Sequence, residues 1–387
     1  MVLTEMKDLI LTLLRNGVLI PLMLAGFVSL LIIITIKIKS SNVKVFLVSI
    51  IAIFIALFLY EGYFPVASLI HSNKEMIPST FSKIDNENHP ILGYSPPLQG
   101  EYLQRYTNWK NEITENMCTI KNHLRTTPNS NLRSQKNLLV FGCSFMFGFG
   151  IDDNSTLPFF INQQSQNAFK VFNHGMIGYG THQMLAQIEH LVPKEISVLN
   201  TDNLALYWFL PDHIRRAAGY SSWDRYGPRY EINNSLEYKG SFTKFKESKL
   251  RRLTQMVLDQ SKIYRNLYLK PKFNRKATTY DVQRASAIIA KSNQLLNDLN
   301  TQFYVLVWDY PFEVNLALQN PDDLNLFLSE LKDAQVNIIL FSDILPYEEY
   351  EKNKHLYTLN EQDSHPSPYL NELVAKYLAK IINPQEE

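Results

Sequence analysis

The sequence predicts an α/β protein with a parallel sheet between layers of helices, preceded by two apolar segments long enough to cross a membrane. Three observations predict this class. From residue 137 onward, short apolar runs alternate with helical patterns, which is typical of parallel sheets covered by helices. Before residue 64 stand two long runs without a charged side chain. With 45% hydrophobic and only 19% charged residues, the composition excludes a disordered chain.

Each strand of the sheet is predicted from a short apolar run bounded by polar or turn-forming residues. The strands are expected at residues 137–141, 169–172, 204–210, 303–308 and 336–341. Helical patterns lie between and after them, at residues 157–163, 182–191, 282–299, 324–334 and 369–382. Before the last helix, Ser367 suits the N-cap position and Pro368 the first helical position.

Two apolar runs near the N-terminus predict a hairpin of transmembrane helices. Residues 17–36 read GVLIPLMLAGFVSLLIIITI, and residues 45–60 read VFLVSIIAIFIALFLY. A bilayer core of about 30 Å needs about 20 helical residues, which the second run reaches when it is extended to residues 43–63. A cleaved signal peptide is the alternative, but its apolar region of about 7 to 15 residues is shorter than either run.

Basic residues around these runs predict the orientation. Lys37, Lys39 and Lys44 lie in or beside the short link, so the positive-inside rule places the link in the cytoplasm and both ends outside. Lys7 and Arg15 argue weakly for the reverse, although residues 1–16 hold a pattern typical of a short interfacial helix. The sequence therefore predicts a multi-pass membrane protein whose main domain is extracytoplasmic, either periplasmic or extracellular.

The composition also bears on partners. The 38 Lys and Arg nearly balance the 37 Asp and Glu, so no broad basic field is expected to bind nucleic acid. Cys118 and Cys143 are too few for a disulfide framework and too far apart for a CxxC pair. The sequence implies no metal ion and no organic cofactor.

The patterns divide the chain into four parts: residues 1–16, two spans within residues 17–63, a linker and β-rich lead-in over residues 64–136, and an α/β domain over residues 137–387. An insertion at about residues 215–280 interrupts the alternation. It holds a hairpin that turns at Asn233 and Asn234, and then a basic segment. The basic side chains either meet anionic lipid headgroups or an acidic polysaccharide, or form a solvated helix face, which is the simpler interpretation.

The first predicted strand leads into the stretch GCSFMFGFG, which places Ser144 just beyond the strand end. Sites in open parallel sheets form at the carboxyl ends of the strands. A serine at the start of a helical turn there presents its hydroxyl beside amide groups that stabilise an oxyanion. The alternative is that these glycines and phenylalanines serve only packing. Met146 stands where a GxSxG elbow has its second glycine, which argues against an α/β-hydrolase.

Two further stretches complete a candidate site. NHGMIGYGTHQ follows the second strand and holds Asn173 and Gly178 in a glycine-dense turn. DSHPSP near the C-terminus places Asp363 and His365 two residues apart, so in an extended chain their side chains point the same way. His365 then suits a base that takes the proton of Ser144 while Asp363 holds its tautomer. The alternative is that Asp363 caps a turn and His365 is only solvated.

Together these motifs resemble the SGNH, or GDSL-type, serine hydrolase superfamily over residues 137–382. Ser144 matches the nucleophile of the first block, and Asn173 with Gly178 five residues later matches the second. Asp363 and His365 match the last block. The resemblance implies a three-layer α/β/α fold with a flavodoxin-like parallel sheet. It also implies a Ser-His-Asp triad and an oxyanion hole formed by the Ser144 and Gly178 amides.

One position departs from the family pattern. The third block normally supplies an asparagine whose amide donates to the oxyanion, but the stretch FLPDHIRR places Asp212 there. An ionised carboxylate cannot donate a hydrogen bond. Either His213 supplies the donor to the oxyanion hole, or Asp212 is a structural acceptor and backbone amides suffice, or activity is reduced. Arg215 and Arg216 either hold an anionic substrate or, as the simpler interpretation, pair with local acids.

The resemblance implies a membrane-anchored serine esterase that hydrolyses an acyl ester or transfers its acyl group. The expected substrate is an O-acetyl group on a cell-envelope glycan or lipid. An alternative from a different class is a non-catalytic glycan-binding or polysaccharide-assembly protein on an SGNH scaffold, which Asp212 favours.

Overall fold

The computed structural model describes residues 19–71, 86–196, 203–243, 254, 258 and 261–382. Two units make up the chain. The first consists of Met1–Pro78 and Lys246–Asn274, and the second of Ser79–Phe245 and Arg275–Glu387. The helix predicted at residues 1–16, and most of the basic segment between residues 244 and 260, lie outside the described residues.

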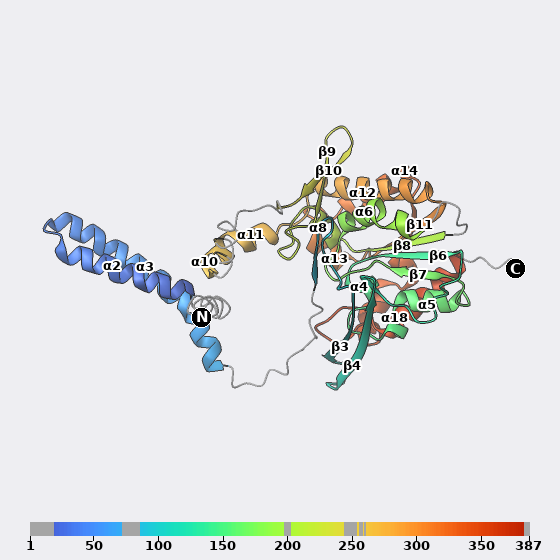
Figure 1. The fold of residues 1–387 in the computed structure, drawn as a ribbon, viewed down its shortest axis with the longest axis horizontal. Helices are drawn as coiled ribbons and strands as arrows, with labels where there is room; N and C mark the ends of the chain where they lie inside the picture. The colour runs from blue at the N-terminus through green and yellow to red at the C-terminus, as the bar shows by residue number, and fades with distance from the viewer. Residues whose placement is uncertain are drawn as a thin grey trace. The chain divides into compact units, whose positions relative to one another are not determined.

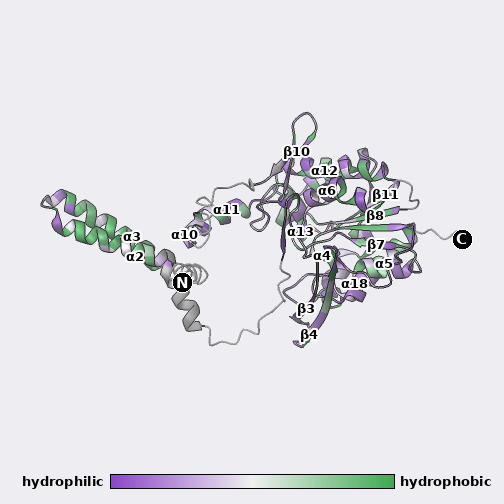
Figure 2. Cartoon of the chain, in the orientation of Figure 1, coloured by the Kyte–Doolittle hydropathy of each residue, from purple (hydrophilic) through white to green (hydrophobic). Residues whose placement is uncertain are grey.

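The first unit contains two apolar helices, α2 (Leu19–Lys37) and α3 (Ser41–His71). Figure 2 shows both as predominantly hydrophobic. The rings of Phe27 and Phe54, with centroids 4.8 Å apart, bring the two helices into contact. Ser41–Glu61 is long and apolar enough to cross a bilayer, and α2 holds a shorter apolar stretch. Both predicted helices are therefore present, while their insertion and orientation in a membrane stay predictions.

The same unit contains part of the predicted insertion. A continuous helical stretch, with a π-helical turn in its middle, is made of α10 (Lys262–Tyr264), η2 (Arg265–Leu269) and α11 (Lys270–Phe273). Glu61 of α3 caps its start, because its carboxylate accepts from the Ser261 hydroxyl at 2.6 Å and from the amides of Lys262 and Ile263 at 2.8 and 3.0 Å. Glu61 is only 2% exposed, so these donors replace the water that a buried carboxylate needs.

The second unit is built on an eight-stranded sheet. Its five parallel strands are β6 (Asn137–Gly142), β7 (Lys170–Asn173), β8 (Asn203–Phe209), β11 (Thr301–Val307) and β12 (Asn337–Leu340). They lie in the order β12-β11-β8-β6-β7, which is the flavodoxin-like strand order. The antiparallel strands that extend the sheet beyond β7 are β5 (Leu124–Arg125), β4 (Ile113–Lys121) and β3 (Gln99–Thr107). The predicted parallel sheet is confirmed, and its extension by the lead-in is an addition to the prediction.

Helices cover both faces of this sheet (Figure 1). One layer contains α5 (Leu157–Gln164) and α18 (Pro368–Ile382), and the other contains α6 (Thr181–His190), α12 (Thr279–Asn297) and α14 (Asp323–Asp333). Strand β6 illustrates why both faces need a helical cover: its successive side chains point to opposite faces of the sheet. Leu138 and Val140 join the core beneath α5 and α18, whereas Leu139 and Phe141 join the core beneath α6 and α12. The three-layer α/β/α architecture is confirmed.

Shorter elements complete the second unit. They are β1 (Glu87–His89), β2 (Gly93–Ser95), α4 (Ser144–Phe147), η1 (Asp153–Ser155), α7 (Val192–Glu195), α8 (Asp212–Ala217), β9 (Pro228–Ile232), β10 (Leu236–Ser241), α13 (Pro311–Ala317), α15 (Phe341–Ile344), α16 (Tyr347–Lys352) and α17 (Lys354–Tyr357). Strands β9 and β10 pair as the hairpin predicted to turn at Asn233 and Asn234.

Candidate active site

Ser144 lies at the junction between β6 and α4, at the carboxyl end of the sheet. β6 ends at Gly142, and α4 begins at Ser144. A Cβ atom on Gly142 would lie 2.9 Å from the Cβ of Met146, so only glycine fits beneath this turn. Met146 is fully buried in the core, which explains why a side chain stands where an elbow motif has its second glycine. The turn therefore exposes the Ser144 hydroxyl to a cavity while the residues around it pack.

His365 connects Ser144 to Asp363. The His365 Nε2 atom lies 2.7 Å from Ser144 Oγ, and the ring Nδ1 contacts Asp363 Oδ1. The His365 backbone amide donates to the same carboxylate oxygen at 3.0 Å. Burial by itself would raise the pKa of the Asp363 carboxyl, but the hydrogen bonds and charge of His365 hold that pKa below its ordinary value. An ionised Asp363 favours the tautomer in which Nδ1 carries the proton and Nε2 accepts one.

Packing and capping orient the histidine. The His365 ring packs against two phenylalanines of the α4 region, with its centroid 5.4 Å from that of Phe145 and 4.8 Å from that of Phe149. Its carbonyl accepts from the Leu359 amide at 3.1 Å. The Ser367 hydroxyl accepts from the Leu370 amide at 3.2 Å, which confirms the predicted N-cap of α18. The loop and the helix start therefore hold His365 toward Ser144.

The glycine-dense turn after β7 provides amide groups beside the serine. Asn173 donates to the Met146 carbonyl at 3.2 Å and accepts from the Gly175 amide at 3.0 Å, so it joins this turn to α4. Gly178 has a φ of +83°, and a Cβ atom there would lie 2.5 Å from Nε1 of Trp223. Within the described part of the chain, the amides of Ser144 and Gly178 have no hydrogen-bond acceptor. Both are thus available to an oxyanion.

These groups open into one cavity of about 620 Å³. Ser144, His365 and Gly178 line it together with side chains from other parts of the unit, namely Asn86, Asn88, Tyr94, Phe149, Arg216, Trp223 and Tyr226. Most of these additional residues come from the lead-in and the predicted insertion. Apart from Arg216, no motif in the sequence marks them, because their place at the cavity depends on how distant parts of the chain pack together.

The structure does not bring Asp212 or His213 to this cavity. The Asp212 carboxylate contacts the guanidinium groups of Arg215 and Arg216, at 2.5 and 2.7 Å. His213 is fully buried, and its Nδ1 atom lies 2.7 Å from the Tyr207 hydroxyl. The hypothesis that His213 donates to the oxyanion therefore needs correction: its ring faces the core behind β8. Asp212 instead fits the other expected role, that of a structural acceptor.

The two neighbouring arginines lie in different surroundings. Arg215 binds Asp212, and its Nε donates to the Arg275 carbonyl at 2.8 Å. Arg216 binds the other carboxylate oxygen of Asp212 but also lines the cavity that holds Ser144. The structure thus separates the two candidate substrate-binding residues, and only Arg216 lies where a substrate of Ser144 would bind.

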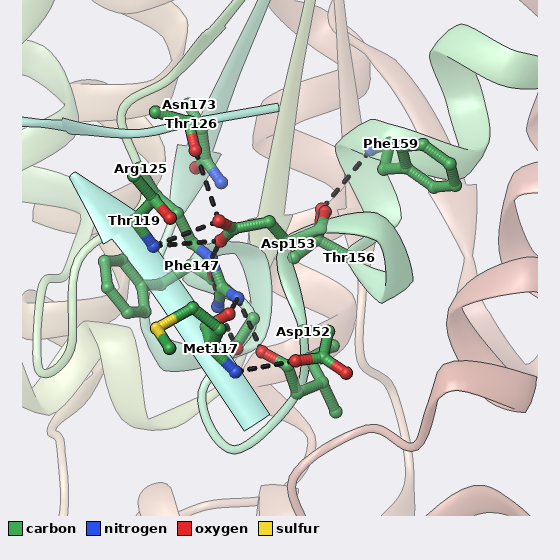
Figure 3. A network of polar contacts seen from close by, with 12 residues as sticks. Met117, Thr119, Arg125, Thr126, Phe147, Asp152, Asp153, Thr156, Phe159 and Asn173 are labelled. Atoms are coloured by element: carbon green, nitrogen blue, oxygen red, sulfur yellow. Dashed lines mark hydrogen bonds and ion pairs between the residues drawn. The ribbon is translucent and has the colours of Figure 1, made fainter. Parts of the chain in front are cut away.

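Figure 3 shows a polar network under the loop that follows α4. The side chain of Arg125, from β5, is fully buried, and its Nε donates to Asp153 at 2.9 Å. Its two terminal nitrogens donate to the carbonyl oxygen of Phe147 at the end of α4 and to those of Gly148 and Ile151 in the loop. The same loop carries Phe149, which contacts the His365 ring. Arg125 therefore holds a loop that shapes the candidate site.

Solved structures to which this chain is similar include a lipolytic protein and two esterases. A lipolytic protein of the G-D-S-L family from Veillonella parvula is 11% identical over 64% of this chain and 96% of that chain, with a TM-score of 0.37. An acetyl-xylooligosaccharide esterase from a Geobacillus species is 11% identical over 65% and 95%, with a TM-score of 0.37. An acetyl xylan esterase from Butyrivibrio proteoclasticus is 10% identical over 76% and 72%, with a TM-score of 0.32.

No protein-family model matches the sequence, and no curated protein matches it significantly. These identities and TM-scores are low, so the fold and the site of this chain have to define the class of protein. It is a flavodoxin-like α/β/α sandwich in which a serine, a histidine and an aspartate meet at the carboxyl end of the sheet. Among the described residues, no group of three or more His, Cys, Asp and Glu is placed to hold a metal ion.

Proposed function

We propose that this chain is a membrane-anchored serine esterase of the SGNH type, which cleaves an acyl ester through Ser144, His365 and Asp363. The observation that carries the proposal is the hydrogen-bonded series from Asp363 through His365 to Ser144, with 2.7 Å between Nε2 and Oγ. A serine hydroxyl becomes a nucleophile when a histidine within this distance can accept its proton.

The mechanism follows from these positions. Ser144 Oγ attacks the ester carbonyl while its proton passes to His365 Nε2, and Asp363 stabilises the resulting imidazolium. The oxygen of the tetrahedral intermediate accepts from the Ser144 and Gly178 amides. The intermediate collapses, the C–O bond breaks, and the leaving alcohol takes the proton from His365. A water molecule or another hydroxyl then attacks the acyl-enzyme, with His365 as base, and frees Ser144.

The substrate that we propose is an O-acetyl group, or a similar small acyl group, on a cell-envelope glycan or lipid. Two features support it: the apolar helices before the catalytic unit are suited to anchoring it at a membrane, and the cavity holds aromatic and amide side chains of the kind that bind sugars. The positive-inside rule supports a catalytic unit outside the cytoplasm, because the basic residues gather at the link between the helices.

A non-catalytic glycan-binding role is less well supported. It was favoured by Asp212, but in the structure this residue holds two arginines and leaves the contact between Ser144 and His365 intact. A site that had lost its catalytic function would not be expected to retain a serine, an orienting carboxylate and two amides without acceptors together at the sheet edge.

The test is covalent labelling of the full-length protein, in detergent, with a fluorophosphonate probe. We expect the wild type to be labelled and to hydrolyse 4-nitrophenyl acetate, and Ser144→Ala to lose both properties while its thermal unfolding is unchanged. Cys143→Ala is the matched control, because the thiol lies 3.8 Å from Ser144 Oγ and is also buried. Labelling of Ser144→Ala at the wild-type rate would refute the nucleophile, and an unlabelled wild type would favour the binding protein.

A further inference from the structure

Arg216 is a cation built into the wall of the cavity that contains Ser144. Only 12% of its side chain is exposed. Its Nε donates to Asp212 at 2.7 Å and its Nη1 to the Tyr179 carbonyl at 2.8 Å. Among the described residues, no acceptor contacts the remaining nitrogen, Nη2. The guanidinium is therefore held rigidly at two nitrogens and keeps one donor group for a partner outside the protein.

The charge balance around Arg216 favours an anion as that partner. Burial by itself would raise the pKa of the Asp212 carboxyl, but Arg216 and Arg215 lower that pKa below its ordinary value, so Asp212 is ionised. The two guanidinium groups thus share one carboxylate. The nearby Asp224 is buried and accepts from His182 and Gln183 at 2.6 and 2.7 Å.

The walls next to Arg216 are aromatic. Its guanidinium carbon lies 5.8 Å from the ring centroid of Trp223, and Trp223 is 55% exposed. Nε1 of Trp223 donates to the Gly178 carbonyl at 3.2 Å, so this ring contacts both the arginine and a residue of the proposed oxyanion hole. Tyr94 and Tyr226 line the same cavity. Flat aromatic faces beside a polar donor suit the faces of a sugar ring.

We propose that Arg216 binds an anionic group of the substrate, so that the ester cleaved at Ser144 is carried by an acidic sugar. This inference rests on the proposed esterase function and names its substrate class. The acidic group is a carboxylate or a phosphate, either of which accepts from the free Nη2 of Arg216. Trp223 packs against the sugar ring, and the acyl carbonyl lies at the Ser144 and Gly178 amides.

The test compares pairs of sugar esters in which one member bears an acidic group at C6 and the other is neutral. The full-length wild type in detergent is assayed with peracetylated galacturonate against peracetylated galactose, and with acetylated glucose 6-phosphate against acetylated glucose. We expect kcat/KM to favour the charged member of at least one pair by about tenfold or more, mainly through a lower KM, because a hydrogen bond to a charged group contributes about this factor. The two pairs identify whether the anion is a carboxylate or a phosphate.

Two variants connect the preference to the residue. Arg216→Gln should remove the preference for the charged substrate, and Arg216→Lys should keep part of it, since a lysine retains the charge without the rigid guanidinium. Arg215→Gln is the matched control. Arg215 carries the same charge as Arg216 and contacts the same Asp212, but it lies outside the cavity, so the preference should persist in this variant.

The outcomes separate this inference from the proposed function. An enzyme that is labelled at Ser144 and cleaves charged and neutral sugar esters equally, or cleaves neither, would overturn the role of Arg216 and leave the esterase intact. Loss of the preference in Arg215→Gln but not in Arg216→Gln would also overturn it. A wild type that neither reacts with the fluorophosphonate probe nor cleaves an aryl ester would instead refute the esterase itself.

Discussion

His365 Nε2 lies 2.7 Å from Ser144 Oγ, although 221 residues separate the two in the sequence. The serine is held by the end of β6 and the histidine by the loop that leads into α18. Both elements belong to the same core layer, which also contains Leu138 and Leu370. The contact between the two side chains is therefore a consequence of how α18 packs on the sheet, and it leads to predictions at and around the site.

We expect Asp363→Asn to lower kcat for an aryl ester by about 10⁴-fold without unfolding the protein. An amide in place of the carboxylate no longer selects the tautomer of His365 that accepts the serine proton. Steady-state kinetics together with circular dichroism provide the measurement. Glu361→Gln, an exposed residue of the same loop, is the control and should retain wild-type kcat. A loss below tenfold in Asp363→Asn would contradict the role given to this carboxylate.

The Asp212 carboxylate makes stability depend on pH. Its pKa in the folded state is lower than its ordinary value of 3.8, because Arg216 and Arg215 outweigh burial. The ionised group therefore stabilises the fold above about pH 3.8, and this contribution is lost as the pH falls through the folded pKa. We expect the wild type to exceed Asp212→Asn in Tm near pH 7, with the difference shrinking below about pH 4. A difference that is constant with pH would argue against the ion pairs.

We expect His213→Ala to reduce stability and leave catalysis alone. Burial, together with Arg216 and His182, lowers the pKa of His213 well below its ordinary value, so the ring is neutral inside the core. Its removal leaves a cavity and an unpaired Tyr207 hydroxyl, which costs about 2 to 4 kcal/mol of unfolding free energy. Chemical denaturation and kcat of the folded enzyme are the measurements. A 100-fold fall in kcat with unchanged stability would restore His213 as an oxyanion donor.

The Arg125 network should be a large contributor to stability. Arg125→Met leaves Asp153 without its buried partner and frees the carbonyl oxygens of the loop after α4, at a cost of about 3 to 5 kcal/mol. Arg105→Met is the matched control, because Arg105 pairs with Glu115 at 2.6 Å but is half exposed, and it should cost less than about 1 kcal/mol. Denaturant titration of both variants checks the contrast, and equal losses would refute it.

Glu61 should stabilise the helical stretch that it caps. Glu61→Gln replaces a charged acceptor of three donors by an amide, so we expect faster protease cleavage within residues 261–273. Tyr60→Phe is the control, since it removes only the exposed bond between Asn266 and the Tyr60 hydroxyl. Limited proteolysis with mass spectrometry provides the readout. Cleavage of Glu61→Gln at the wild-type rate would show that the cap does not hold this stretch.

Local patterns were sufficient for the parallel strands and the five longer helices of the α/β unit. Each predicted strand lies within a few residues of an observed one, as with residues 137–141 and Asn137–Gly142. Hydrophobic periodicity is a property of neighbouring residues, so it survives without knowledge of the fold. The lead-in was less predictable, because β3 (QGEYLQRYT) and β4 (ITENMCTIK) hold no continuous apolar run. Their place in the large sheet also depends on pairing with β5 and β7.

Local patterns in the chain predicted the order of the main α/β elements, the candidate roles of Ser144, Asp363 and His365, and the apolar character of the N-terminal helices. These depend on spacing along the chain. That Arg216 rather than Arg215 lines the cavity, with Trp223 beside it, follows from the three-dimensional packing and not from spacing. Two consecutive residues of a helix point about 100° apart, so the packing of α8 against its neighbours selects which one faces a substrate.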